Sequence, residues 1–381
     1  MHLNPIETLP KQESRPRAGA SAKPRVAVVR TRPETVLEDV GRAMDMAGYR
    51  DHLPKDRELS LKINITWHKW FPGCSTTPWQ LEGVIKRLLA DGYETSRMNC
   101  AQNSTVVVDT RVGEVNNKLK PLLQKYGIRT IYLNDQGAEW VRYEPKGKML
   151  VLDHVYPKGI WLPKSLIGES VIHLPTMKTH VFTQITGSMK NAFGGLLHFK
   201  RHWTHSVIHQ TLVDLLTIQK EIHTGIFTVT DGTICGDGPG PRAMRPHVKN
   251  FLLAGADSVA CDAVQAKMMG FDPLSIPFIR IAHEKGLGVG DVREMEIVGE
   301  DISKVDFGFH GHENTFASKG QKLIYHGPLK PLENLLLRSP IVPWSYLASR
   351  LYHDVYWYNI VGKQRIKPIL KTEWGKLWRT Y

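Results

Sequence analysis

Six segments rich in apolar and β-branched residues alternate along the chain with segments of helical periodicity, and this alternation constrains the fold most. The segment 59–67 is strand-like, and 78–92 follows it with a stripe of Leu, Val and Ile at helical spacing. Strands that alternate with helices predict an α/β fold, with a largely parallel or mixed sheet flanked by helices. The strand-like segments are 25–30, 59–67, 128–135, 169–175, 226–232 and 251–257, with a weaker one at 293–299.

The two ends of the chain differ in composition from its middle. Residues 1–24 are rich in Pro, Ser, Lys and Arg and lack the apolar stretch of a secretory signal, so we expect a disordered lead-in. Residues 25–310 are expected to form the α/β core, which can divide into two lobes near 140–165. In residues 311–381 aromatic side chains alternate with Lys and Arg. This extension suits packing over the core or over a second subunit of a homo-oligomer, and it also suits contact with a membrane surface.

The net charge of +13 favours anionic partners. No nucleic-acid-binding motif accompanies the charge, so we expect no specific nucleic acid, and an anionic small molecule or an acidic membrane surface remains. The sequence has no run of 18 apolar residues that could span a membrane, which predicts a cytoplasmic protein, peripheral to the membrane if the extension binds one. Its four cysteines show no CxxC spacing, so reduced thiols are expected and an iron–sulfur cluster is disfavoured.

Polar side chains occur where several predicted strands end, and ligands bind at this edge of parallel sheets. Lys62 and Asn64 share one face of the segment 59–67, and a buried lysine needs a partner or a ligand. Thr77 precedes the helix at Pro78 and can bind an anion there, or can serve only as the helix N-cap.

A second group of polar residues follows the segment 169–175. It includes Lys178, His180 and Lys190. Two lysines and a histidine can share a small site only if they surround an anion or if one lysine loses its proton. Asp231 ends another predicted strand and begins a glycine-rich loop, a common place for a catalytic carboxylate. The predicted substrate-binding residues are Lys62, Asn64, Thr77, Lys178 and Asn191, and the predicted catalytic residues are His180, His205, His209, Asp231 and Lys190.

Four histidines, His198, His202, His205 and His209, are spaced as on one face of an α-helix. His205 and His209 could together bind Fe²⁺, Zn²⁺ or Ni²⁺, since an i, i+4 pair can direct two imidazoles at one ion. Two other interpretations stay open: the histidines exchange protons or bind an anion, or they fill polar gaps in the core. The identity of any cofactor is not set by the sequence.

Four segments, 61–92, 174–195, 230–241 and 254–273, resemble in order the motifs of the family known as domain of unknown function 362. The resemblance implies a fold more than an activity, although relatives that carry ferredoxin-like modules suggest redox chemistry. This chain lacks such a module and has Ile63 where the family usually has proline. The matched residues are Lys62, Asn64, Thr77, Lys178, His180, Thr183, Lys190, Asn191, Asp231 and Asp262.

These observations lead to two hypotheses. The first is an enzyme that acts on a carboxylate or phosphate in a basic, histidine-rich crevice, assisted by a metal or cofactor, with redox chemistry favoured through the resemblance alone. The alternative is a non-catalytic protein that binds a metal or a metabolite and docks on a membrane or a partner through its C-terminal extension.

Overall fold

The computed structural model describes residues 23–105, 107–311, 313–314, 319–320 and 349–381. The predicted lead-in therefore lies outside the described residues up to residue 22. Of the predicted extension, residues 312, 315–318 and 321–348 also lie outside them.

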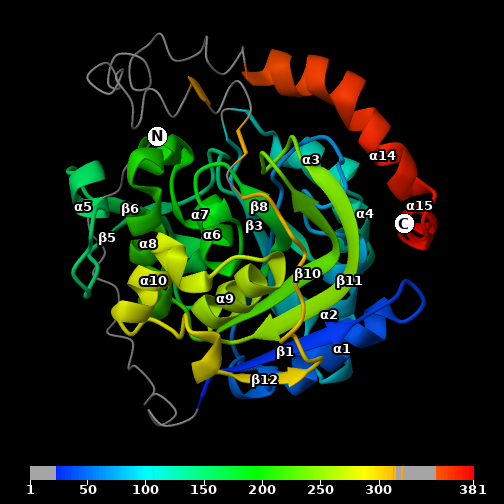
Figure 1. Cartoon of the computed structure of the whole chain (residues 1–381). Helices are drawn as coiled ribbons and strands as arrows, with labels where there is room; N and C mark the ends of the chain where they lie inside the picture. Colours follow the sequence, from blue (N-terminus) through cyan, green and yellow to red (C-terminus); the bar gives the residue numbers. More distant parts are fainter. Residues whose placement is uncertain (1–22, 106, 312, 315–318, 321–348) are drawn as a thin grey trace.

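Ten strands of the described chain form one mixed sheet, whose main path has the order β12-β1-β11-β10-β7-β2-β3-β4 (Figure 1). Neighbours on this path run parallel except at β11, which is antiparallel to both β1 and β10. The predicted α/β fold is confirmed. The strands are β1 (Arg25–Arg30), β2 (Leu59–Ile63), β3 (Met98–Gln102), β4 (Arg129–Tyr132), β7 (Ser170–Leu174), β8 (Thr176–His180), β9 (Gln184–Ile185), β10 (Ile226–Asp237), β11 (Arg245–Gly255) and β12 (Glu296–Gly299).

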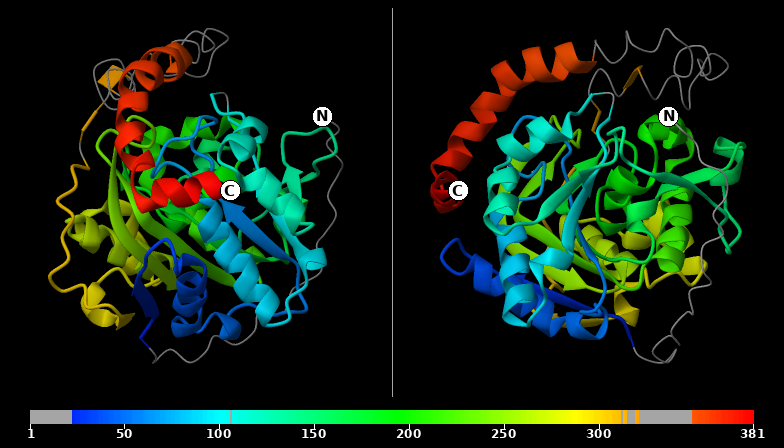
Figure 2. Two further views of the ribbon diagram at one scale, coloured as in Figure 1. Left: turned by 90° about the vertical axis from the view of Figure 1, so that its right-hand side faces the viewer. Right: turned by 180° about the vertical axis from the view of Figure 1, so that it is seen from behind.

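Helices cover both faces of the sheet because successive side chains of a strand point to opposite faces. Along β1, Ala27 and Val29 pack with α1, α2 and α4, whereas Val26 and Val28 belong to the core formed with α8, α9 and α10. The two halves of this arrangement are visible on either side of the sheet in Figure 2. The helices are α1 (Val36–Met46), α2 (Pro78–Ala90), α3 (Thr110–Asn116), α4 (Leu119–Lys125), α6 (Ser188–Asn191), α7 (Phe193–Leu196), α8 (Ile208–Ile222), α9 (Ser258–Met269) and α10 (Pro277–Glu284).

A separate two-stranded sheet lies in the region where the core was expected to divide. It consists of β5 (Trp140–Tyr143) and β6 (Ile160–Pro163), with the short helix α5 (Leu152–Val155) between them.

The strand that contains Asp231 is longer than predicted. We expected Asp231 to end a strand, but β10 continues to Asp237 and pairs with β11 along this whole stretch, with a register shift between Gly232 and Ile234. Hydrogen bonds to a neighbouring strand keep the glycine-rich segment extended, and the sequence alone does not reveal that partner.

The last described residues, 349–381, form what we call the C-terminal arm. It consists of a π-helical segment (Leu351–Gly362), α14 (Lys363–Leu370) and α15 (Glu373–Thr380). The arm runs along the outside of the core beside α3 and α4 (Figures 1 and 2). Within the described part of the chain, no helix has both the length and the apolar character required to cross a bilayer.

Candidate anion site

Four of the predicted binding residues meet in one hydrogen-bonded network. The Lys178 Nζ donates to the Asn64 Oδ1 at 2.7 Å and to the Cys74 carbonyl at 2.6 Å. The Asn64 Nδ2 donates to the Asn191 Oδ1 at 3.3 Å, and the Asn191 Nδ2 donates to the Lys62 carbonyl at 2.7 Å. The network therefore joins the end of β2, strand β8 and helix α6 at one place in the fold.

The two lysines of this network are buried. Lys62 is 5% exposed and Lys178 is 1% exposed. Burial, which disfavours the charged form, lowers the pKa of each lysine to about 8. The Lys62 Nζ donates to the Ile63 carbonyl at 2.6 Å, so both ammonium groups have neutral oxygen acceptors.

Two further cations lie beside these lysines. The Lys190 Nζ lies 5.3 Å from the centre of the Phe193 ring, and the guanidinium carbon of Arg201 lies 5.9 Å from the same centre. Burial, together with the charges of Lys178 and Arg201, lowers the pKa of Lys190 to about 7. Arg201, 6% exposed, donates to the Asn103 carbonyl at 3.0 Å.

We call Lys62, Lys178, Lys190 and Arg201 the cation cluster. Across the described residues, none of the four forms an ion pair with a carboxylate. Buried charges are normally paired, because an unpaired ionised group inside a protein is costly. An arrangement of this kind is suited to hold an anion that is not part of the chain.

His180 lies at the end of β8 next to the cluster. It is 5% exposed, and its Nδ1 accepts a hydrogen bond from the Phe182 amide at 3.1 Å. Burial, and then the charges of Lys190, His205, Lys178 and His209, hold the pKa of His180 well below its ordinary value. The ring is therefore neutral near pH 7, and because Nδ1 accepts, the proton resides on Nε2. His180 can thus donate one hydrogen bond to a bound ligand.

The predicted α-helical face of four histidines is wrong. Residues Phe199–Val207 form a 3₁₀ helix and α8 begins only at Ile208, so residues four apart do not stack as they do in an α-helix. Arg201 anchors the 3₁₀ segment through its bond to Asn103, a tertiary contact that local spacing does not predict. The His202 side chain lies outside the described atoms.

His205 and His209 consequently have different neighbours. The His205 ring meets Phe182 and Phe193 edge-on, with centroids 5.4 and 5.7 Å apart, while His209 stacks on Phe278 at 5.9 Å. In the described part of the chain, no group of three or more His, Cys, Asp or Glu side chains is placed to hold a metal ion. A metal bound by His205 and His209 would therefore need ligands from elsewhere.

Thr77 and Asp231 form a buried link rather than part of the cation cluster. The Thr77 Oγ1 donates to the Asp231 Oδ2 at 2.5 Å and accepts from the Gln80 amide at 3.4 Å, as an N-cap of α2 does. The Asp231 Oδ1 accepts from the Thr233 amide at 2.7 Å, and burial raises the pKa of Asp231. One oxygen of this fully buried carboxylate thus joins β10 to the start of α2, and the other forms a hydrogen bond within β10.

Sequence analysis did not select two residues that shape the site. Arg201 lies in the histidine segment, and no pattern in the sequence marks it as a member of the cluster. Asp262 belongs to the matched family motif but was not assigned to the site. Its carboxylate accepts the amides of Ser188 and Met189 at 2.6 and 3.0 Å, which fixes the start of α6 and so positions Lys190 and Asn191. Burial raises the pKa of Asp262 to about 7.

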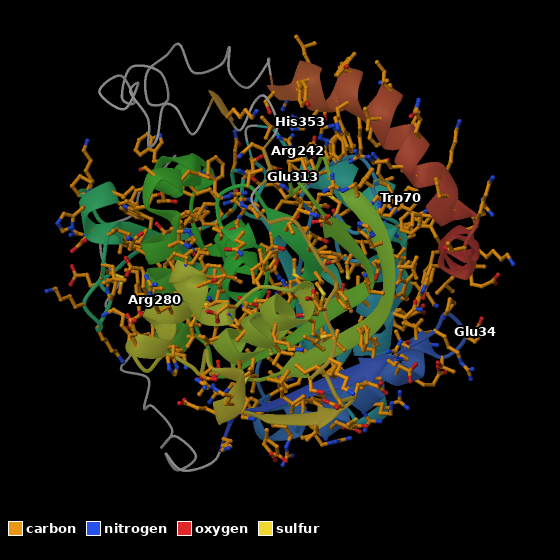
Figure 3. The ribbon with its side chains drawn as sticks, viewed as in Figure 1. Glu34, Trp70, Arg242, Arg280, Glu313 and His353 are labelled. Carbon is orange, nitrogen blue, oxygen red and sulfur yellow. The ribbon has the colours of Figure 1, made fainter. Side chains whose placement is uncertain are left out.

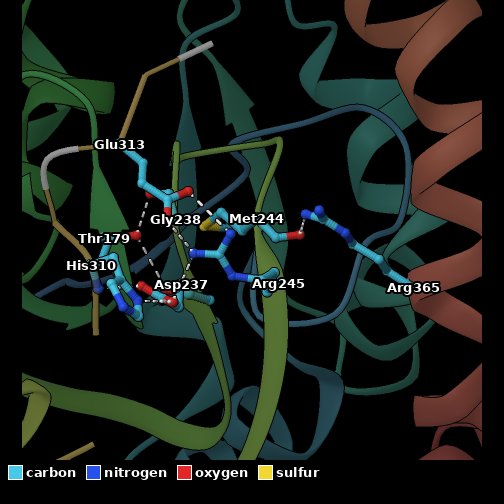
Figure 4. A network of polar contacts seen from close by, with 9 residues as sticks. Thr179, Asp237, Gly238, Met244, Arg245, His310, Glu313 and Arg365 are labelled. Atoms are coloured by element: carbon cyan, nitrogen blue, oxygen red, sulfur yellow. Dashed lines mark hydrogen bonds and ion pairs between the residues drawn. The ribbon is translucent and has the colours of Figure 1, made fainter. Parts of the chain in front are cut away.

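The end of β10 and the following turn lie beside β8 (Figure 4). The Thr179 Oγ1 donates to the Gly238 carbonyl at 2.7 Å. Asp237 accepts from Arg245 at 3.1 Å and from the His310 amide at 2.6 Å, and Arg245 also pairs with Glu313. These bonds fix the segment that flanks β8 on the side of its carboxyl end.

Three comparisons relate the chain to known proteins. A family model described as Domain of unknown function (DUF362) matches residues 60–267, which contain the whole cation cluster. The Thylakoid-associated protein sll1697 of Synechocystis is 25% identical over 238 residues, which are 61% of this chain and 69% of that protein. A crystal structure of a Thermotoga maritima protein aligns with a TM-score of 0.37 and 13% identity; the match covers 71% of this chain and only 61% of that protein.

Proposed function

Because the chain belongs to the DUF362 family, whose name assigns no activity, we propose its function from the site itself: it is an enzyme that binds an anionic small molecule at the cation cluster and exchanges a proton with it. The observation that carries this proposal is that three buried cations, Lys62, Lys178 and Arg201, lie with the half-buried Lys190 and none of the four has an ion-paired carboxylate among the described residues. A carboxylate or phosphate would supply the missing negative charge.

The anion would approach from the side of Asn64, Lys190 and Gly194, because these residues of the site keep part of their surface exposed. Gly194 leaves room there. A Cβ atom at this position would stand 3.6 Å from the Lys62 Nζ, which is ordinary contact distance, so the missing side chain opens a path to the buried ammonium. Asn64 and Asn191 would hold the lysines in place through the hydrogen bonds described above.

Proton transfer is the chemistry that these side chains supply by themselves. Lys190, with a pKa of about 7, is present in both protonation states near neutral pH, which suits a general acid or base. His180 would donate its Nε2 proton as a hydrogen bond to charge that develops on the substrate. A metal- or redox-assisted reaction would require groups beyond these residues, and it is not part of this proposal.

The binding half of the proposal is tested by titration calorimetry with phosphate, pyrophosphate and small dicarboxylates. We expect binding by the wild type, strong loss with Lys190→Met, and no change with Lys249→Met, a half-buried lysine that lies over the Phe307 ring. Equal affinity in all three proteins, or no binding of any of these anions, would remove the proposed site.

The catalytic half is tested by incubating each bound carboxylate in D₂O and measuring deuterium at carbon by mass spectrometry. Enzymatic exchange that Lys190→Gln abolishes supports proton transfer. Binding without exchange favours the alternative hypothesis of a non-catalytic metabolite-binding protein.

The name of the Synechocystis relative and the composition of the C-terminal arm support a peripheral membrane location for this chain. We propose this location independently of the reaction. Association of the purified protein with lipid vesicles is its direct test, and absence of association with vesicles of any composition would reject it.

A further inference from the structure

The C-terminal arm is held firmly to the core along its inner side. The Trp67 Nε1 donates to the Asp354 Oδ1 at 2.6 Å, and the Tyr358 hydroxyl donates to the Trp70 carbonyl at 3.1 Å. Farther along the arm, Trp70 and Trp378 stack with ring centroids 4.3 Å apart. Figure 3 shows Trp70 between the core and the arm. The arm therefore presents a fixed outer surface.

The winding of the first segment of the arm separates its residues into two faces. In a π-helix the hydrogen bonds run from i to i+5, so residues four and five positions apart lie on the same face. The buried residues His353, Trp357 and Gly362 follow this spacing on the inner side. The exposed residues Leu351, Val355, Tyr356 and Ile360 follow it on the outer side.

The outer face is unusually apolar for an exposed surface. Leu351, Val355, Tyr356 and Ile360 are 52, 58, 55 and 51% exposed. Among the described residues only three other large apolar side chains are comparably exposed, so most of this exposed apolar surface lies on one helical segment. Grouped exposure of this kind marks an interaction site.

The outer face continues into α14 as a row of cations. Lys363, Lys367 and Lys371 are exposed, while Ile366 and Ile369 are buried against the core. Between residues 351 and 371 the only acidic side chain is Asp354, and it is engaged on the inner side with Trp67 and His68. The outer face is thus apolar at its beginning and positively charged at its end.

We infer that this outer face, residues 351–371, docks on an anionic lipid surface. The inference rests on the proposed peripheral location and gives it a surface and a lipid chemistry. The apolar residues would enter the headgroup region and the three lysines would contact lipid phosphates, as in amphipathic helices that lie in a membrane interface. The charge pattern favours an anionic lipid surface over an uncharged protein surface, because an uncharged surface would offer the three lysines no negatively charged partner.

The test is co-sedimentation of the full chain with phosphatidylcholine vesicles, with and without phosphatidylglycerol. Wild-type protein should bind the anionic vesicles preferentially. Replacing Lys363, Lys367 and Lys371 together by Gln should weaken this binding about a hundredfold and remove most of its salt dependence. Replacing Leu351, Val355 and Ile360 together by Ser should reduce binding to both kinds of vesicle.

The matched control replaces Val112 and Val115 of α3, which are 44 and 53% exposed, by Ser; it should bind as the wild type does. Circular dichroism of each variant verifies the fold. If the wild type binds anionic vesicles and both variants of the arm bind equally well, the inferred face is wrong while the peripheral location stands. If the wild type binds no vesicles, the location itself fails. If the wild type is a dimer and the arm variant with Ser at 351, 355 and 360 is a monomer, the outer face contacts a second copy of the chain instead of lipid.

Discussion

Replacing Lys62 by Met should make the ligand-free protein more stable, because the fold buries this ammonium at a cost. The pKa of Lys62 falls from 10.5 to about 8 on folding. The unfolded chain therefore holds more protons than the folded one between these values, and stability conferred by this position rises as pH increases through that window. Below about pH 8 the full cost of the buried charge is present.

The size of the effect follows from the same two pKa values. The difference corresponds to a cost of about 3 kcal/mol at pH 7 and of about 1 kcal/mol at pH 10. Met keeps a similar volume but loses the hydrogen bond to the Ile63 carbonyl, which contributes about 1 kcal/mol. We expect the variant to gain about 2 kcal/mol at pH 7 and almost nothing at pH 10.

Urea unfolding of wild type and Lys62→Met at both pH values, without added anions, measures this directly. Lys118→Met is the control: the Lys118 Nζ donates to the Trp378 carbonyl at 2.7 Å and lies 5.0 Å from the Trp378 ring centre, so its loss should destabilise the protein. A Lys62→Met protein that is less stable than the wild type at pH 7, or whose gain is the same at both pH values, would refute the reasoning. Lys62 would then be a structural residue.

Three further predictions concern the same site. Because the pKa of Lys190 is about 7 and an anion favours its charged form, anion affinity should fall as pH rises from 6 to 9, and binding near pH 7.5 should take up a proton. Calorimetry in buffers of different ionisation enthalpy measures both effects, and an affinity independent of pH would contradict the assignment of Lys190. Gly194→Ala should keep the stability of the wild type, since the added Cβ would lie at an ordinary contact distance of 3.6 Å from the Lys62 Nζ. The same Cβ should weaken anion binding because it fills the path to the Lys62 ammonium, and unchanged affinity would place the ligand elsewhere. Asp262→Ala should lower the free energy of unfolding by about 1–3 kcal/mol, because two buried backbone amides lose their acceptor. Chemical denaturation measures this loss, and a smaller loss would contradict the role of Asp262.

The sequence predicts the fold well where apolar periodicity is strong. β1 has its predicted bounds, and α2 ends within two residues of the predicted end at residue 92. Strand β8 was not predicted, because its segment, Thr176–His180, is polar at four of five positions although every residue in it is buried. Its burial depends on hydrogen bonds to β9, β10 and the Asn64 network, and such long-range partners leave no local periodicity.

The site shows the same division between local pattern and tertiary contact. Alternation along one strand is enough to place Lys62 and Asn64 on the same face, and the structure brings that face to Lys178 and Asn191. Arg201 belongs to the cluster because it lies in the 3₁₀ helix Phe199–Val207. The histidine spacing predicts an α-helix for this segment instead.

Neutral oxygens hold the ammonium groups of Lys62 and Lys178 without neutralising them, and this limits the kinds of ligand that the cluster can select. The Asn64 Oδ1 accepts from both Lys178 and Thr66, so its acceptor capacity is filled, while its Nδ2 is bonded to Asn191. The Lys178 ammonium therefore has little freedom to move, and its two neutral acceptors leave its charge uncompensated. A site of fixed, uncompensated cations discriminates by the charge of the ligand, since each additional negative charge interacts with all four cations in a medium of low dielectric constant. Pyrophosphate and dicarboxylates should accordingly bind more tightly than acetate, and an uncharged amide analogue of the same shape should not bind.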